Sequence, residues 1–122
     1  MHPTFVPLYE EGGLGWLDGF DELLVRCGLA SNGAPDFDSQ GRLTYPVHGK
    51  IANLPAHFLE VSVERGTGEI SVTGIVDETR FHFLKLRLVS TLKTSPGERG
   101  FRIIDRVENL SENAAEAQLL YH

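Results

Sequence analysis

The strongest constraint on the fold is an alternation of apolar and polar side chains between residues 58 and 109. In its first run Leu59, Val61 and Val63 alternate with polar residues, a pattern typical of a strand with one buried and one solvated face. Similar runs follow, separated by turns rich in Gly, Pro and Asp, at 70–76, 84–93 and 101–107. A period of two does not suit an amphipathic helix. The pattern therefore predicts an all-β protein, an antiparallel β-sandwich or barrel with little helix.

The segments before and after this region are less regular. Residues 14–20 predict a short helical turn that ends near Gly19, and residues 21–27 predict a short buried strand that ends before Gly28. Residues 30–44 are rich in turn-forming residues and predict a long polar loop, which in a compact domain is typical of a functional segment.

The last nine residues begin a final strand that stops without a turn or a polar tail. We expect a single domain over residues 1–122, with an irregular arm and loops over 1–44 and antiparallel strands over 45–122. We further expect it to be the N-terminal part of a larger β-sandwich. The edge left at residues 114–122 predicts association into a homo-oligomer, because unpaired strand edges pair readily with other chains.

Composition excludes several classes of function. The formal net charge is −6 and the 11 Lys and Arg residues are scattered, which argues against a nucleic-acid partner. No apolar run approaches the ~20 residues that span a bilayer, so we expect no membrane partner. The N-terminus lacks a basic segment followed by an apolar one, which predicts a cytoplasmic protein. A single cysteine, Cys27, excludes an internal disulfide, and we interpret it as a small buried residue without a functional role.

The segment over residues 45–57 is the most plausible place for chemistry. It contains His48 followed by Gly49, which lets a backbone approach a ligand closely, and Pro46 and Pro55 bracket it. A titratable imidazole in a rigid loop suits acid–base chemistry. The alternative is a structural histidine in a loop.

Several stretches together suggest a family. They are Tyr-Pro-Val-His-Gly-Lys at 45–50, Val-Glu-Asn-Leu at 107–110 and Leu-Leu-Tyr-His at 119–122. With them the chain resembles the aldose 1-epimerases, the galactose mutarotase-like group. Arg-Cys-Gly-Leu-Ala-Ser-Asn-Gly at 26–33, followed by His-Gly-Lys-Ile-Ala-Asn-Leu-Pro-Ala at 48–56, resembles an uncharacterised branch of it. The resemblance covers residues 12–122 and matches the N-terminal portion of the family.

The resemblance implies a partial galactose mutarotase-like supersandwich and an isomerase that interconverts sugar anomers without a cofactor. It places His48 beside the ring oxygen of the sugar and makes His122 the general acid. Lys50 stands where the family has a second glycine, and Tyr121 where it has an asparagine. The general base of the family is a glutamate that lies downstream of residue 122. The resemblance therefore implies that these 122 residues alone are inactive.

Two other functions compete with an isomerase. The first is a carbohydrate-binding module without chemistry, in which a sugar or sugar derivative lies in a groove lined by Trp16, Lys50, Asn53 and Arg80. Arg80 falls in a predicted turn at 77–80, where its guanidinium can grip two hydroxyls. Trp16 can stack on a sugar or, alternatively, anchor a loop to the core.

The second competing function is a metal site, which would draw on four histidines: His48, His57, His82 and His122. Such a site would resemble that of a cupin, but the clustered His-x-His spacing is missing, so we expect no metal and no cofactor. His57 and His82 are interpreted as residues at the solvent edge of the sheet.

Overall fold

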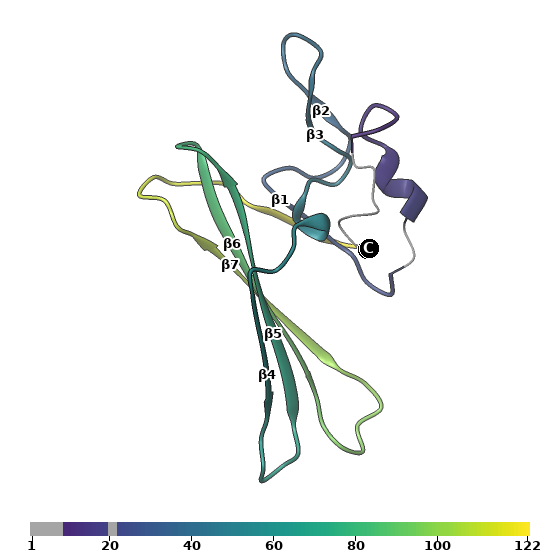
Figure 1. Cartoon of the computed structure of the whole chain (residues 1–122), viewed down its shortest axis with the longest axis vertical. Helices are drawn as coiled ribbons and strands as arrows, with labels where there is room; N and C mark the ends of the chain where they lie inside the picture. The colour runs from purple at the N-terminus through teal and green to yellow at the C-terminus, as the bar shows by residue number, and fades with distance from the viewer. Residues whose placement is uncertain (1–8, 20–21) are drawn as a thin grey trace.

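The computed structural model describes residues 9–19 and 22–122, and the described residues form strands joined by turns with two short 3₁₀ helices (Figure 1). Residues 1–8 of the predicted arm, and the element ends predicted at Phe20 and Asp21, lie outside the described residues. The elements in chain order are η1 (Gly15–Gly19), β1 (Arg26–Leu29), β2 (Asp36–Phe37), β3 (Leu43–Tyr45), η2 (Ile51–Asn53), β4 (Phe58–Val63), β5 (Ile70–Arg80), β6 (Leu84–Thr94), β7 (Arg102–Asn109) and β8 (Gln118–Tyr121).

The region of strict alternation forms one antiparallel sheet in the order β4-β5-β6-β7. Neighbours along the chain are neighbours in the sheet, so each short turn closes a hairpin. Its register places Val61, Val72 and Leu92 side by side on one face, as the period of two requires. The predicted all-β antiparallel architecture is confirmed.

One end of this face carries the larger core. Leu86 and Leu88 on β6 pack against Leu29 of β1 and Ile51 of η2, and all four are buried. The β1–β8 pair and η2 thus form the second layer of a sandwich over the upper part of the sheet in Figure 1. The sheet continues well below this layer, which explains why Val61 and Val63 remain exposed among the described residues.

A smaller core cluster lies in the N-terminal part of the described chain. It joins Trp16 of η1 and Val47 to Val25 and Cys27, at and just before β1. The helical turn predicted around Trp16 is confirmed as η1. Because the indole is only 4% exposed, its burial favours the interpretation in which Trp16 anchors a loop to the core.

The strand predicted over 21–27 is wrong in its position. It begins at Arg26 and continues through Gly28, which has φ = +132°. A Cβ at Gly28 would lie 2.1 Å from the backbone oxygen of Gln118, so only glycine lets β8 pair at this point. Contrary to the prediction, Gly28 therefore does not end the strand but allows a close backbone approach within it.

The loop predicted over 30–44 and the turn predicted over 77–80 also differ from the structure. The first contains β2 and β3, which pair as a short hairpin. At the second, β5 continues to Arg80, and the turn follows at residues 81–83. Asp77 pairs with Arg87 across the ladder, so charged residues that suggested a turn belong to a strand.

The final strand forms as predicted but pairs differently. β8 lies beside β1 rather than joining the four-stranded sheet, with Cys27 opposite Leu120. One side of the edge at residues 114–122 is therefore occupied within the chain, and association into a homo-oligomer stays a prediction. No helix among the described residues is long and apolar enough to cross a membrane.

Leu86→Ala tests the larger core. Leu86 is 1% exposed, and truncation of a buried leucine costs about 2–5 kcal/mol because it leaves a cavity. We expect the urea midpoint of unfolding to fall accordingly. The control is Leu59→Ala, since Leu59 is 68% exposed and its truncation should change the free energy of unfolding by no more than about 0.5 kcal/mol. Equal losses in the two variants would contradict this description of the core.

Candidate functional site

The loop that carries His48 is held by its own backbone. The amide N–H of His48 donates to the oxygen of Gly33 (2.8 Å), and its carbonyl accepts from the amide of Gly28 (3.0 Å). His48 has φ = +60° and Gly49 has φ = +77°, so both lie in the left-handed region. With both backbone polar groups bonded, the imidazole projects from a fixed point.

Gly49 is required by close packing as well as by its φ. A Cβ there would lie 2.3 Å from the backbone oxygen of Ser31 and 2.4 Å from that of Gly28. Gly28 and Gly49 form an isolated parallel bridge, and the amide of Lys50 donates to the oxygen of Gly28 (3.1 Å). The sequence-based expectation that Gly49 allows a close approach is correct, but the approaching group is the chain itself.

The second histidine reaches the same place from the other end of the chain. His122 follows β8, and its backbone exchanges two hydrogen bonds with Val25, N to O at 3.0 Å and O to N at 3.1 Å. The ring centroids of His48 and His122 lie 4.6 Å apart, with the planes at 63°. The expected proximity of these two residues is confirmed. They lie together although 73 residues separate them along the chain.

Trp16 borders both rings. Its centroid lies 5.3 Å from that of His48 and 6.2 Å from that of His122. A buried indole at the back of two imidazoles lowers the local polarity and limits how far the rings can turn. Of the two roles suggested for Trp16, sugar stacking and anchoring of a loop, its position suits anchoring and support of the histidines.

Asn32 fixes the orientation of His48. Its Oδ1 lies 3.1 Å from Nδ1 of His48. Since an amide oxygen only accepts, this contact assigns a proton to Nδ1 and leaves Nε2 of a neutral ring with a free lone pair. Sequence reasoning missed Asn32, although it belongs to the stretch 26–33 that carried part of the resemblance.

Cys27 is the other residue that sequence reasoning missed. It is buried, as predicted, but its thiol belongs to the site. One ligand atom each from Cys27, His48 and His122 lie within 4.8 Å of one another. Its place in β1, opposite Leu120 of β8, brings it beside the end of β8, which no sequence pattern reveals.

Burial shapes the electrostatics of the site. It lowers the pKa of His48 from its ordinary value, and the neighbouring charge of His122 lowers it further. Burial raises the pKa of the Cys27 thiol. Both effects favour neutral groups.

A partly buried ionic network around Asp105 supports the β1–β8 pair. Arg26 Nε donates to Asp105 Oδ2 (2.5 Å), Arg26 Nη2 donates to the Ser90 hydroxyl (2.8 Å), and the Tyr121 hydroxyl donates to Asp105 Oδ2 (2.8 Å). Burial alone would raise the pKa of Asp105, but the hydrogen bonds from Arg26, Ser90 and Tyr121 outweigh it and hold that pKa below its usual value. The network links β1, β6, β7 and β8 and so fixes the strands that flank both histidines.

A second buried carboxylate lies where β1 meets the sheet. Glu78 of β5 accepts the amide N–H of Leu29 on Oε2 (2.8 Å) and that of Ala30 on the same oxygen (3.3 Å). Among the described residues its Oε1 is buried and has no hydrogen-bond partner. Burial raises the pKa of Glu78, although the two amides and the charge of Lys50 oppose that rise.

The remaining candidate residues do not join the histidines. Nζ of Lys50 lies 4.7 Å from the ring centroid of Tyr45, a cation–π contact. Asn53 is buried, and neither atom of its amide has a hydrogen-bond partner among the described residues. Arg80 ends β5 and lies over the ring of Phe83 at 5.5 Å. The β5–β6 turn and the C-terminal end lie on opposite sides of the molecule in Figure 1, so the groove expected to hold all four residues is not formed.

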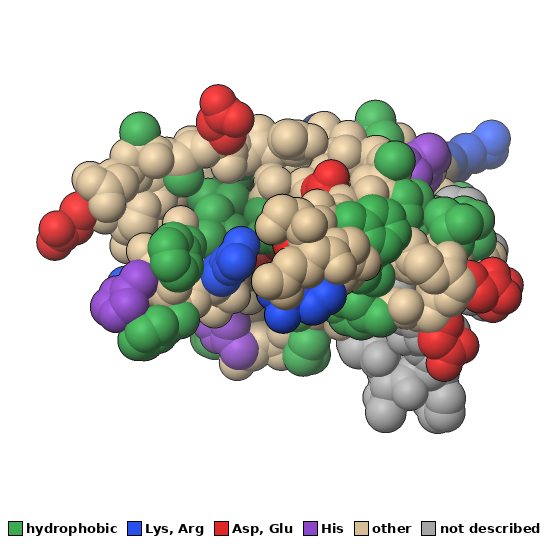
Figure 2. Space-filling view, turned by 90° about the horizontal axis from the view of Figure 1, so that it is seen from above, with side chains coloured by type: hydrophobic (Ala, Val, Ile, Leu, Met, Phe, Trp, Pro, Cys, Tyr) green, Lys and Arg blue, Asp and Glu red, His purple; other side chains and the backbone are tan. Residues whose placement is uncertain are grey.

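The other histidines also lie elsewhere. Nε2 of His57 contacts Asp77 Oδ2 at 3.2 Å, and His82 lies in the exposed turn after β5. Figure 2 shows histidine side chains at well-separated places on one face of the molecule. Both residues lie at the solvent edge, as expected, and the four-histidine metal site considered from the sequence does not form among the described residues.

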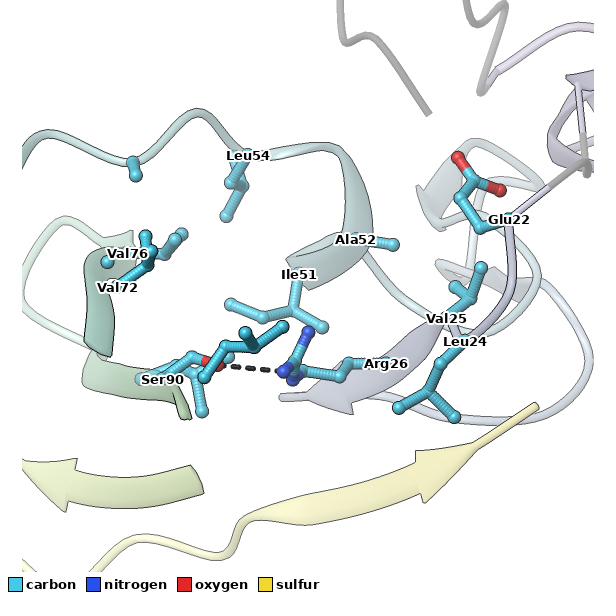
Figure 3. Close-up of a pocket in the computed structure, with 14 residues that line it drawn as sticks. Glu22, Leu24, Val25, Arg26, Ile51, Ala52, Leu54, Val72, Val76 and Ser90 are labelled. Atoms are coloured by element: carbon cyan, nitrogen blue, oxygen red, sulfur yellow. Dashed lines mark hydrogen bonds between the residues drawn. The ribbon is translucent and has the colours of Figure 1, made fainter. Parts of the chain in front are cut away.

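An open apolar pocket of about 410 Å³ separates β1 and η2 from the sheet (Figure 3). Arg26 extends into it toward Ser90, with Val72 and Val76 on the opposite wall. Neither histidine lines this pocket. Its apolar lining marks it as a gap between two layers of the sandwich, so we place the chemistry at the histidines, where polar groups converge.

Gly49→Ala tests the close approach behind His48. The added Cβ would strike two backbone oxygens and occupy a left-handed φ, so we expect a loss in the free energy of unfolding on the order of 1–3 kcal/mol or more. The matched control is Gly97→Ala, which has φ = +85° but no atom within 4 Å of its Cβ. Urea unfolding of the two variants separates the clash with backbone oxygens from the strain of a left-handed φ. An equal loss in both variants would mean that the clash at Gly49 costs nothing, which would contradict the prediction.

Glu78→Gln tests the buried carboxylate through pH. The pKa of Glu78 is raised in the fold, so the native state retains a proton that the unfolded chain releases. The free energy of unfolding of the protein therefore falls as the pH rises above the pKa of Glu78 in the unfolded chain. Glutamine does not titrate, so the variant should gain stability relative to the parent as the pH rises above about 4, where the unfolded glutamate ionises. Exposed Glu98, changed to Gln, is the control for urea unfolding at each pH. A difference that stays constant with pH would contradict this assignment.

Comparisons with known proteins agree with this fold. A sequence model of the family described as "Domain of unknown function (DUF4432)" matches residues 1–122. No curated protein matches the chain. A crystal structure described as a "putative aldose 1-epimerase" from Klebsiella pneumoniae subsp. pneumoniae MGH 78578 is 36% identical in sequence and superposes with a TM-score of 0.89.

The match covers 98% of this chain and 31% of the Klebsiella chain, so these 122 residues span about a third of its length. The resemblance to aldose 1-epimerases found in the sequence therefore holds in sequence and in fold, and the predicted mutarotase-like β-sandwich is confirmed. Because the family model spans every residue, the chain belongs to the DUF4432 family.

Proposed function

We propose that this chain supplies the proton-donating side of a sugar isomerase site of the aldose 1-epimerase type. The observation that carries the proposal is the pair of imidazoles from His48 and His122, with centroids 4.6 Å apart. Two imidazoles at one spot can share and deliver a proton near neutral pH, as ring opening of a sugar requires. The likeness to the Klebsiella protein supports an aldose as the ligand.

In the proposed reaction His122 donates a proton to the ring oxygen while the bond between that oxygen and the anomeric carbon breaks. A base removes the proton of the anomeric hydroxyl, and its electrons form the carbonyl of the open aldehyde. Rotation about the adjacent carbon–carbon bond and the reverse steps close the other anomer. His48 steadies the hydroxyl that the ring oxygen becomes once it is protonated. Asn32 accepts the Nδ1–H of His48, so Nε2 is left as an acceptor for the proton of that hydroxyl.

The supporting residues differ from those expected at first. Trp16 and Asn53 are buried, so we assign Trp16 to positioning of the imidazoles and give Asn53 no direct contact with a sugar. Lys50 and Arg80 lie outside the histidine pair and remain candidates for remote sugar hydroxyls only. The proposed reaction still needs a carboxylate base, which the resemblance places outside these residues.

The alternative is a binding module on the same fold. It is motivated by Lys50 and Tyr121, which stand beside the two histidines where the resembled family has a glycine and an asparagine. The two functions share the ligand and differ in proton transfer.

His122→Gln and His48→Gln test the isomerase proposal in a polypeptide that carries the base as well as these residues. Loss of a positioned acid costs about 10²–10⁴ in rate, so we expect exchange between the α and β anomers, measured by NMR, to fall by that factor in each variant. Sugar affinity should weaken less than turnover, because both residues act chiefly in the transition state. His82→Gln, in the exposed turn, is the matched control and should leave exchange unchanged.

Sugar binding is tested in the chain as it stands. Addition of an aldose should shift the ring resonances of His48 and His122 and leave those of His82 in place. Shifts together with unchanged anomer exchange in both variants would favour the binding module. An absence of shifts at saturating sugar would contradict both functions.

A further inference from the structure

We propose that Cys27, His48 and His122 bind a borderline-soft divalent cation, with Zn²⁺ as the best match, and that the bound ion holds the histidines out of proton transfer. The cation site stands on its own geometry, whereas the inhibitory effect rests on the proposed function.

The donor set favours zinc over hard cations. One thiolate and two imidazoles form a sulfur–nitrogen set, which suits Zn²⁺, whereas Mg²⁺ and Ca²⁺ prefer oxygen ligands. These three side chains come from three separate segments, since Cys27 lies in β1, His48 in the loop after β3 and His122 after β8. The fold alone brings them together.

The spacing requires only a small contraction. Zn–S and Zn–N bonds of about 2.3 and 2.0–2.1 Å at tetrahedral angles place ligand atoms about 3.3–3.6 Å apart. Here the three ligand atoms lie within 4.8 Å of one another, so the side chains need to move together by roughly 1 Å. Cys27 is buried and fixed within β1, so the contraction falls mainly on His122, an exposed residue that follows β8.

The surroundings prepare His48 for this role. Metal-binding histidines commonly donate their second ring N–H to an oxygen, which fixes the tautomer and the orientation of the ring. Asn32 Oδ1 supplies that acceptor at 3.1 Å from Nδ1 and leaves Nε2 for the ion. Hydrogen bonds at both backbone groups of His48 keep the ring beside Cys27.

The set has three protein ligands and an opening beside exposed His122. This is the arrangement of zinc sites that keep one position for water or substrate. An ion bound here would occupy the imidazole nitrogens that ring opening needs. The site would therefore respond to the supply of zinc.

Calorimetric titration of the metal-free chain with ZnCl₂ tests the site. We expect one ion per chain, with affinity reduced at least about tenfold in Cys27→Ser and in His122→Gln, since loss of an outer partner alone costs about 10–100-fold. His82→Gln is the matched control and should bind as the parent does. His122 is exposed, so His122→Gln should fold. That variant therefore still tests the site if Cys27→Ser does not fold.

Cobalt supplies a second readout that does not depend on activity. Co²⁺ bound at this site should give the near-ultraviolet charge-transfer band of a cobalt–thiolate bond, and the band should vanish in Cys27→Ser. Equal zinc affinity in Cys27→Ser, His122→Gln and the parent, or cobalt binding without that band, would overturn the site. Zinc affinity and the cobalt band do not depend on activity, and anomer exchange is first measured in metal-free protein. The isomerase proposal can therefore fail while the cation site holds. Zinc binding that leaves anomer exchange at its metal-free rate would overturn the inhibitory effect alone.

Discussion

The contact between the backbones of Gly28 and Gly49 is the constraint on which the site depends. A side chain at either position would overlap a carbonyl oxygen, at 2.1 Å for Gly28 and 2.3 Å for Gly49. Through this contact β1 holds the His48 loop on one side and β8 on the other. The two imidazoles meet because two glycines let three stretches of backbone lie closer than side chains allow. The chemistry proposed for the pair follows from backbone packing first and from the histidines second.

Two buried carboxylates fix this arrangement, and they differ in how well the fold stabilises their charge. Glu78 bonds two amides at the end of β1, and Asp105 holds Arg26 and Tyr121 on the neighbouring pair of strands. A buried carboxylate is stabilising only where its hydrogen bonds outweigh the loss of solvation. The opposite directions of the pKa changes show that this balance differs, since Asp105 is favoured as an anion and Glu78 is not. Both residues tie β1 to the large sheet, and the position of the site depends on that attachment.

The proposed proton transfer and the proposed cation site use the same imidazoles in different ways. Proton transfer requires His122 to carry a proton toward a sugar, whereas a bound cation requires the ring nitrogens to be free of protons. Asn32 serves both by orienting His48, and Cys27 serves only the cation. A buried thiol beside two histidines is therefore the feature that separates this site from a simple acid–base pair. The two proposed uses are mutually exclusive at any moment, so a bound zinc ion would inhibit the proposed proton transfer.

The sequence alone determined the four-stranded sheet, because a period of two leaves a strand as the only element that can bury one face. The turns after Val63 and Thr94 and the helical turn at Trp16 followed from local residues in the same way. The resemblance also singled out His48 and His122, but their 4.6 Å separation depends on pairing between β1 and β8, which lie at opposite ends of the chain. Cys27 joined them through the same pairing and Asn32 through its contact with His48. Lys50 and Arg80 lie over other aromatic rings, and Asn53 is buried. Local patterns specify strands and turns because those depend on near neighbours, whereas only the tertiary structure decides which distant side chains meet.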